Sequence, residues 1–425
     1  MRRTRRALGL GIIVLALAIA GVIFGLRSST AQSPPLPAHA SGSWPMYQLD
    51  ATHNAVLSGP QLHANFQAPL GDRINAGFAY DNGVIYATSL DHKLYAIDAT
   101  TGKIRWSSWA DDMLMSTPVF SKGLIVIGSG HNGFLKPKDP VSQTWGRAGG
   151  NTVYAFSLDG KLVWRFHTDG EDMPSPAIDG DSVAFANGDG HAYALDLATG
   201  KLKWKTELSG VATMASAAID DGMVFVSACH NAPYFCETRA LDLQSGKTIW
   251  TNPNGGSDCA PAVAGGLVFV NGNRDDARFH TGGVDVVAAL DEHTGQTRWT
   301  WESEPGPYTF PATNERQIAG TVAGGVLYQP IGTASRMIAF DAATGKVLWN
   351  LRTWANVKMS PVVTVDRVYF GDAGGVLYAV DRKSGDVVST DSFLQPFSAA
   401  PPLIVGDTIF VAVGPVVVAM PLSGL

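Results

Sequence analysis

One short unit recurs along the chain: a strand-like segment, the turn Asp-x-x-Thr/Ser-Gly, and a second strand-like segment that carries a Trp. Its first half alternates residue types as a half-buried strand does. The Asp side chain can accept N–H groups of a turn, and the Gly supplies a positive φ that other residues resist. Each unit therefore predicts a β-hairpin. The copies are Tyr95–Trp106, Tyr193–Trp204, Arg239–Trp250, Ala288–Trp299 and Ile338–Trp349, with degenerate copies at Tyr154–Trp164 and Tyr378–Ser389.

The turn glycines recur every forty to sixty residues, and hairpins at about that period are typical of propellers and solenoids. Because blades bury their faces against one another, the repeat favours one closed unit over several domains. We predict an all-β fold, an eight-bladed β-propeller of four-stranded antiparallel blades. The eight turn glycines are Gly102, Gly160, Gly200, Gly246, Gly295, Gly345, Gly385 and Gly424.

The two ends of the repeat region complement each other. Ala64–Leu70 resembles the second strand of the unit, with Phe66 in place of Trp, and lacks a first strand. The final segment, Val416–Gly424, lacks a second strand. We expect the N-terminal strand to complete the last blade and close the ring, which leaves no open sheet edge between first and last blades.

In most repeats a short segment of small residues and Pro stands before the two strands that lead to the Asp-Gly turn, and it predicts a short inner strand. These segments are Ser116–Pro118, Ser175–Pro176, Ala260–Pro261, Ser360–Pro361 and Ala400–Pro401.

Six tryptophans share one position in the repeat, which predicts packing between blades and not ligand contact. They are Trp106, Trp164, Trp204, Trp250, Trp299 and Trp349. Ser389 and Phe66 occupy this position in the two remaining copies, and we expect their blades to be less stable.

The N-terminus carries Arg2, Arg3, Arg5 and Arg6 before an uncharged run from Leu8 to Leu26. A basic segment followed by an apolar one is typical of an export signal, and this run is also long enough to span a bilayer as a helix. Residues 1–31 are thus predicted to be a signal peptide cleaved after Ala31 or an uncleaved membrane anchor. Residues 32–43 read as a flexible linker, and 44–425 as the propeller.

Charge and cysteine content limit the possible partners and the cellular compartment. Residues 1–31 hold five Arg and no acid, so the remainder is acidic, which disfavours nucleic acid as a partner. In an exported chain, Cys229 and Cys236 are expected to form a hairpin disulfide; three free thiols are the alternative.

The repeat unit and the opening Trp44-Pro-Met-Tyr47 resemble the PQQ-repeat (quinoprotein-like) eight-bladed propellers over residues 44–425. The resemblance implies one of two functions. One class is the quinoprotein alcohol dehydrogenases, which use pyrroloquinoline quinone (PQQ) and calcium. The other is non-catalytic envelope scaffolds such as BamB. This chain has neither the adjacent cysteines of the dehydrogenases nor a Cys-x-x-Cys-His haem motif.

Candidate ligand residues precede the inner strands, where we expect them to line the central funnel. Carboxylates beside basic groups could hold calcium and an anionic quinone; charges that balance one another in solvent are the alternative. These candidates are Asn75, Glu171, Asp172, Asp258, Arg316 and Lys358. Met115, Met173, Met214 and Met359 recur in the same region and are interpreted as packing residues.

The loops expected on the face opposite the tight Asp-Gly turns vary most, and variable loops on a rigid scaffold are where binding tends to lie. Candidates on this face are His131, Asn132, His230, Asn231, Arg274 and Asp275. We expect an exported or membrane-tethered scaffold that binds a protein partner in the cell envelope and needs no cofactor. A PQQ- and calcium-dependent alcohol or sugar dehydrogenase is the alternative.

Overall fold

The computed structural model describes residues 62–130, 151–212, 214–231, 234–253, 260–275, 282–304, 306–307, 318–331 and 334–425. Within these ranges, the side chains of 230–235, 273–275, 282 and 306–307 are not described. All described residues belong to one compact unit, Pro34–Leu425. The predicted N-terminal hydrophobic helix lies outside them. In the described ranges, no helix is long and apolar enough to cross a membrane.

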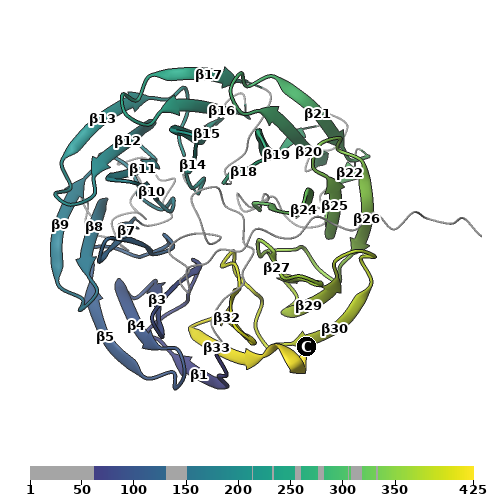
Figure 1. Ribbon diagram of the computed structural model, residues 1–425, viewed down its shortest axis with the longest axis horizontal. Coiled ribbons are helices and arrows are strands. Elements are labelled where there is room, and N and C mark those ends of the chain that lie inside the picture. The colour runs from purple at the N-terminus through teal and green to yellow at the C-terminus, as the bar shows by residue number, and fades with distance from the viewer. Residues whose placement is uncertain are drawn as a thin grey trace, which may run out of the picture. The chain divides into compact units, whose positions relative to one another are not determined.

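Eight antiparallel sheets surround a common axis, as the repeat predicts (Figure 1). Each contains an inner strand A, then B and C, and an outer strand D. Blade one is β2 (Phe78–Asp81), β3 (Val84–Ser89), β4 (Lys93–Asp98) and β5 (Ile104–Trp109). Blade two is β6 (Val119–Ser121), β7 (Leu124–Ser129), β8 (Thr152–Ser157) and β9 (Leu162–His167). Blade three is β10 (Ala177–Asp179), β11 (Ser182–Ala186), β12 (His191–Asp196) and β13 (Leu202–Glu207).

The middle blades contain the longest strands. Blade four is β14 (Ala218–Asp220), β15 (Met223–Asn231), β16 (Tyr234–Asp242) and β17 (Thr248–Asn252). Blade five is β18 (Ala262–Ala264), β19 (Leu267–Asp275), β20 (Gly282–Asp291) and β21 (Thr297–Glu302), and the short β22 (Gly306–Pro307) also pairs with β20.

Three blades complete the ring. Blade six is β23 (Thr321–Ala323), β24 (Val326–Ile331), β25 (Arg336–Asp341) and β26 (Val347–Arg352). Blade seven is β27 (Val362–Val363), β28 (Arg367–Gly371), β29 (Val376–Asp381) and β30 (Val387–Ser392). Blade eight is β31 (Leu403–Val405), β32 (Thr408–Val413), β33 (Val416–Pro421) and β1 (Phe66–Pro69), and the 3-10 helix η2 (Leu422–Gly424) follows β33.

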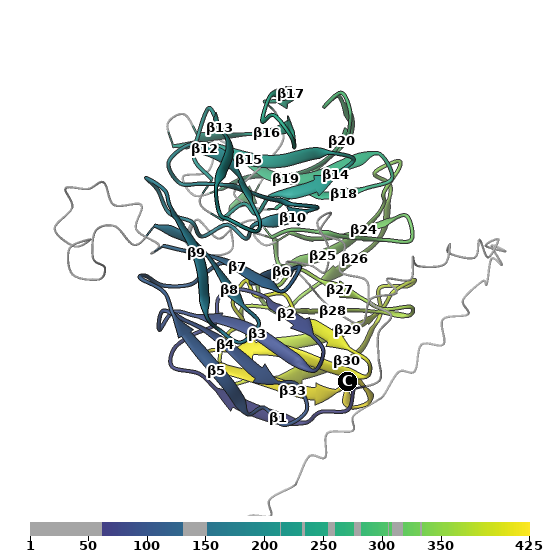
Figure 2. The same ribbon diagram turned by 60° about the vertical axis from the view of Figure 1, so that its left-hand side comes forward.

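The predicted ring closure is confirmed. β1 runs antiparallel to β33, with Phe66 opposite Ala419 and Pro69 opposite Val416. Both views place β1 beside β33 (Figure 2). Because β1 supplies the outer strand of blade eight, strands from the two ends of the repeat region share one sheet.

Each Asp-x-x-Thr/Ser-Gly turn forms as its residues predict. In blade three, Oδ1 of Asp196 accepts hydrogen bonds from the N–H (2.9 Å) and the hydroxyl (2.6 Å) of Thr199. Gly200 follows at φ 68°. The last repeat differs, because Gly424 ends η2 and is not among the residues with positive φ. The prediction of an eighth Gly turn is therefore wrong, although the eighth blade is present.

The small-residue segments precede the inner strands instead of forming them. Pairing begins at Val119, Ala177, Ala262, Val362 and Leu403, directly after the Pro-containing segments.

In blades one to four, the same segments form a hydrogen-bonded relay around the axis. Gly77 N–H donates to Thr117 Oγ1, Thr117 N–H to Ser175 Oγ, and Ser175 N–H to Ser216 Oγ, each over 2.9 Å. Small hydroxyl residues thus satisfy buried backbone groups between blades.

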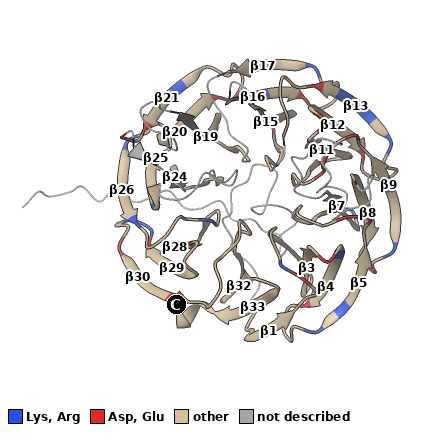
Figure 3. Cartoon of the chain, turned by 180° about the vertical axis from the view of Figure 1, so that it is seen from behind, with Lys and Arg blue, Asp and Glu red and all other residues tan. Residues whose placement is uncertain are grey.

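The apolar core lies mainly between neighbouring blades. Aliphatic and aromatic residues of blades two and three, for example, form one buried cluster. Basic residues, by contrast, are spread along outer strands such as β5, β13 and β21 (Figure 3). The blades therefore bury apolar faces against each other, and the outer strands carry charged residues beside exposed apolar ones such as Ile104 and Leu202.

Candidate functional site

Four of the six predicted funnel residues lie in the described ranges. Asn75, Glu171 and Lys358 are half-buried, whereas Asp172 is only 1% exposed. Asp258 and Arg316 lie outside the described residues.

Asp172 is held by donors of blade three and the connection before it. One carboxylate oxygen accepts from the Thr168 hydroxyl over 2.6 Å, and the other accepts from the Asn187 amide. Burial raises the pKa of Asp172 well above its usual range, although these hydrogen bonds oppose the shift. Its position between these donors indicates a structural role in fixing the segment that leads to β10.

Within the described residues, Asp172 does not offer a free carboxylate for calcium. Calcium takes six to eight oxygen ligands, and both oxygens of Asp172 already accept protein hydrogen bonds. Across the described ranges, no three His, Cys, Asp or Glu side chains gather closely enough to hold a metal ion. We therefore derive no chemistry through the quinone.

Four of the six binding-face candidates lie at the ends of long strands. His131 and Asn132 lie outside the described residues. His230 and Asn231 end β15, and Arg274 and Asp275 end β19, but their side chains are not described.

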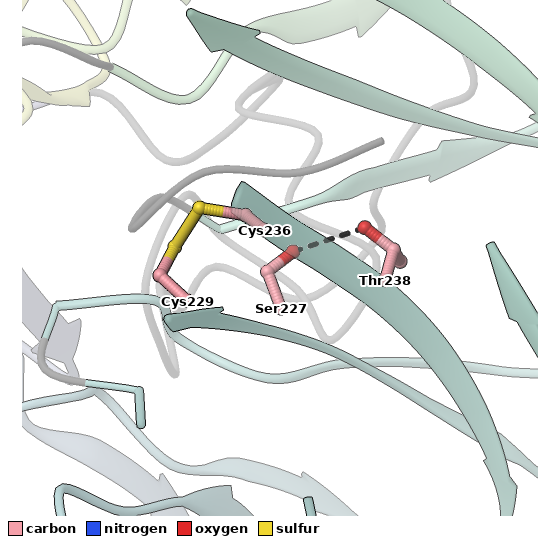
Figure 4. Close-up of a disulfide and its surroundings, with 4 residues drawn as sticks. All are labelled: Ser227, Cys229, Cys236 and Thr238. Atoms are coloured by element: carbon pink, nitrogen blue, oxygen red, sulfur yellow. Dashed lines mark hydrogen bonds between the residues drawn. A yellow bond between two sulfur atoms is a disulfide. The ribbon is translucent and has the colours of Figure 1, made fainter. Parts of the chain in front are cut away.

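A disulfide joins the strands that lead to His230. Cys229 of β15 and Cys236 of β16 are direct register partners and are bonded through sulfur (Figure 4). Two residues before Cys229 and two after Cys236, Ser227 and Thr238 form another register pair. Their hydroxyl oxygens lie 3.2 Å apart and share a hydrogen bond. The covalent link fixes the base of the hairpin that projects from blade four.

The six repeat tryptophans lie between neighbouring blades. Each indole N–H donates to a backbone carbonyl of the next blade, as Trp164 does to Leu197 and Trp204 to Leu243, both over 2.8 Å. The acceptors for Trp106, Trp250, Trp299 and Trp349 are Leu158, Glu292, Ala342 and Arg382.

The next blade's turn glycine lies against each indole: a Cβ on Gly200 would be 2.6 Å from Cδ2 of Trp164. Only glycine fits there, because any larger residue would displace the indole.

A groove that sequence reasoning missed lies between blades six and seven. Its volume is about 970 Å³, and it is lined by Ser335, Arg352, Thr353, Trp354, Val376, Tyr378, Val387, Thr390 and Ser392. Trp354 is 88% exposed. Arg352 forms no ion pair with any residue in the described ranges. Neither residue belongs to the repeat motif, so no pattern in the chain singles them out.

The backbone that carries Trp354 is firmly held. Its N–H donates to the Tyr378 hydroxyl over 2.9 Å, and the next N–H, of Ala355, donates to Asp372 over 3.0 Å. Tyr378 in turn donates to the buried Asp372 carboxylate over 2.9 Å. Burial, reinforced by this carboxylate, raises the pKa of Tyr378 to about 12, so the phenol stays protonated. An exposed indole thus projects from a rigid backbone.

Eight four-stranded blades, docked through a recurring indole and closed by an N-terminal strand, define a β-propeller of the PQQ-repeat class. Residues 48–281 and 283–424 match the model of the family described as outer membrane protein assembly factor BamB, and the chain belongs to this family.

Two relatives with the same sequence identity to this chain have names that indicate different functions. The tetrathionate hydrolase of Acidithiobacillus ferrooxidans is 26% identical over 349 residues, which cover 77% of this chain and 68% of that protein. BamB of Moranella endobia is 26% identical over 336 residues, covering 74% and 77% respectively. A solved quinohemoprotein alcohol dehydrogenase from Comamonas testosteroni shares the fold, with a TM-score of 0.64, 14% identity, and coverage of 88% of this chain and 76% of that one.

Proposed function

We propose that the chain is an extracytoplasmic scaffold that binds a protein partner at the groove between blades six and seven. The observation that carries this proposal is Trp354, which is 88% exposed on a backbone fixed by Tyr378 and Asp372. Large aromatic side chains at the edge of a preorganised pocket are the usual energetic centres of protein interfaces.

The lining of the groove specifies the chemistry of the partner. Val376 and Val387 supply apolar surface, Thr390 and Ser392 supply hydroxyl groups, and Arg352 supplies a cation. A fitting ligand is a peptide segment with an aromatic or aliphatic side chain beside a carboxylate. Similarity to BamB supports a partner in the cell envelope, and the Cys229–Cys236 disulfide supports an oxidising compartment.

Site-specific photocrosslinking in the native host tests the scaffold. A photoreactive phenylalanine analogue replaces Trp354 or, as the matched control, Trp109, which is 68% exposed on blade one. We expect one protein, identified by mass spectrometry, to crosslink at 354 and not at 109, and Arg352→Glu to weaken the adduct. No adduct at 354, or the same adducts at both positions, would refute the assignment.

A second candidate, hydrolysis of tetrathionate, is favoured by the similarity to the hydrolase over more than two thirds of its length. Ion chromatography of purified protein with tetrathionate between pH 2 and pH 7 tests it. Enzymatic consumption of tetrathionate would establish the hydrolase. No consumption of tetrathionate across this pH range, together with a crosslink at position 354, would support the scaffold function and exclude the hydrolase.

A further inference from the structure

Four methionines gather near the axis on the side of blades one to four. Met113 and Met115 lie between β5 and β6, Met173 between β9 and β10, and Met214 between β13 and β14. Together with Leu90 they form one contact cluster. Met173 and Met115 are 2% and 9% exposed, and the other two are half-buried at its edge. The four methionine residues thus come from three consecutive connections between blades and share one cluster.

The hydroxyl relay fixes this arrangement. Met115, Met173 and Met214 each lie two residues before Thr117, Ser175 and Ser216, the residues that the relay joins. Hydrogen bonds of 2.9 Å therefore link the three backbone segments just beyond the methionines. Gly130 N–H also donates to the carbonyl of Met113 over 3.0 Å. The blade framework therefore holds the backbone segments from which the methionine side chains extend.

Thioether sulfur is a soft ligand that selects Cu(I) over the harder divalent ions, which prefer imidazole or carboxylate. In the described part of the chain, His, Cys, Asp and Glu form no group of three that could hold a metal. Thioethers that cluster where the described residues form no such group favour a soft monovalent cation. Met359, which sequence reasoning placed with the others, instead packs among aliphatic and aromatic residues of blades seven, eight and one.

We propose that Met113, Met115, Met173 and Met214 form a binding site for Cu(I). The site lies in a different set of blades from the groove with Trp354, so it is independent of the proposed partner. Binding is a simple association in which thioether lone pairs replace the ion's solvent ligands, and no electron transfer or proton release is involved.

Competition with the chromophoric chelator bicinchoninate tests the site in the full chain. Cu(I) is supplied anaerobically as its acetonitrile complex, without thiol reductants, so that the disulfide persists. We expect one Cu(I) per chain to be withheld from the chelator. The triple variant Met115→Leu, Met173→Leu, Met214→Leu should lose at least 100-fold in affinity. Leu conserves volume and apolarity, and circular dichroism and the melting temperature verify that the variant folds.

Two controls make the outcome specific. Met359→Leu removes a buried thioether from another cluster and should leave the affinity unchanged, as should Cys259→Ser. X-ray absorption of the copper-loaded protein should show a first shell of sulfur only. Equal affinity of wild type and triple variant, loss of binding in Cys259→Ser alone, or a shell of nitrogen and oxygen would each overturn the proposal.

Discussion

Phe66 of β1 covers Gly102 of blade one, and a Cβ atom on Gly102 would lie 2.5 Å from Cδ2 of Phe66. The six repeat tryptophans lie in the same way over the turn glycine of the blade that follows them. Phe66 therefore docks blade eight onto blade one, and the same strand that closes the sheet also closes the last seam of the ring.

Phe66→Ala should lower the free energy of unfolding by about 3 kcal/mol, since it removes a large, partly buried ring and opens a cavity. Phe66→Trp should retain stability, because an indole occupies this position in six other blades. Urea denaturation measures both. If Phe66→Ala unfolds at the same urea concentration as the wild type, the N-terminal strand does not hold the ring closed.

Trp204→Ala should cost about 3–5 kcal/mol of unfolding free energy, since it empties a buried site and leaves the carbonyl of Leu243 without its donor. The exposed Trp354→Ala should change stability by less than about 0.5 kcal/mol. Urea denaturation of the two variants measures the two losses of unfolding free energy. Similar losses would show that a Trp at the docking position stabilises the protein no more than an exposed Trp does.

The seam between blades seven and eight lacks a docking ring. Ser389 occupies the Trp position, its hydroxyl is buried with no hydrogen-bond partner among described residues, and a Cβ on Gly424 would meet no atom within 4 Å. Ser389→Trp should therefore stabilise the protein by about 0.5–2 kcal/mol. Ser392→Trp, on the groove side of the same strand, is the control in calorimetry. Destabilisation by Ser389→Trp would show that the seam is already filled.

Acid should weaken the turns. Hydrogen bonds from Arg105 and Thr101 lower the pKa of Asp98 to about 2, and hydrogen bonds also lower the pKa of Asp196, Asp242, Asp291 and Asp381. A lowered native pKa contributes stability above the unfolded value near 4, and this contribution disappears as the pH falls toward 2.

The melting temperature of wild type should thus exceed that of Asp98→Asn at pH 6, and the difference should shrink between pH 4 and pH 2. Arg105→Met should keep part of this pH dependence, because Thr101 still donates. A difference that stays constant down to pH 2 would argue against the turn carboxylate as its source.

Replacing Cys229 and Cys236 together by Ser should cost roughly 2 kcal/mol, the loop-entropy value for so short a closed loop. Urea denaturation with and without reductant measures the effect, and reductant should no longer change the double variant. Cys259→Ser should leave the reductant response intact; if it abolishes that response instead, the stabilising bond involves a different pair.

The repeat predicts the blades and their number because each of its features depends on residues that are close together in the sequence. The Asp-Gly turn, the strands beside it and the Trp position each follow from a few neighbouring residues, and Phe66 identifies the closing strand. The prediction of a turn at Gly424 is wrong because this residue shares the motif but lies in η2 without a positive φ.

The groove and the methionine cluster depend on contacts between blades, which one copy of the repeat does not encode. The exposed Trp354, for example, has its backbone N–H bound by Tyr378, which belongs to the next blade. Asp172 shows the reverse case: the carboxylate expected in the funnel is buried by Thr168 and Asn187.

The pairing of β1 with β33 imposes an order on biogenesis. During synthesis β1 emerges before any complete blade, and its partner β33 emerges only after the seven blades between them. β1 therefore waits without its partner strand while seven blades assemble, and unpaired strand edges are the aggregation-prone features that chaperones protect. A truncation that removes β33 would consequently leave β1 without its partner strand and the ring open.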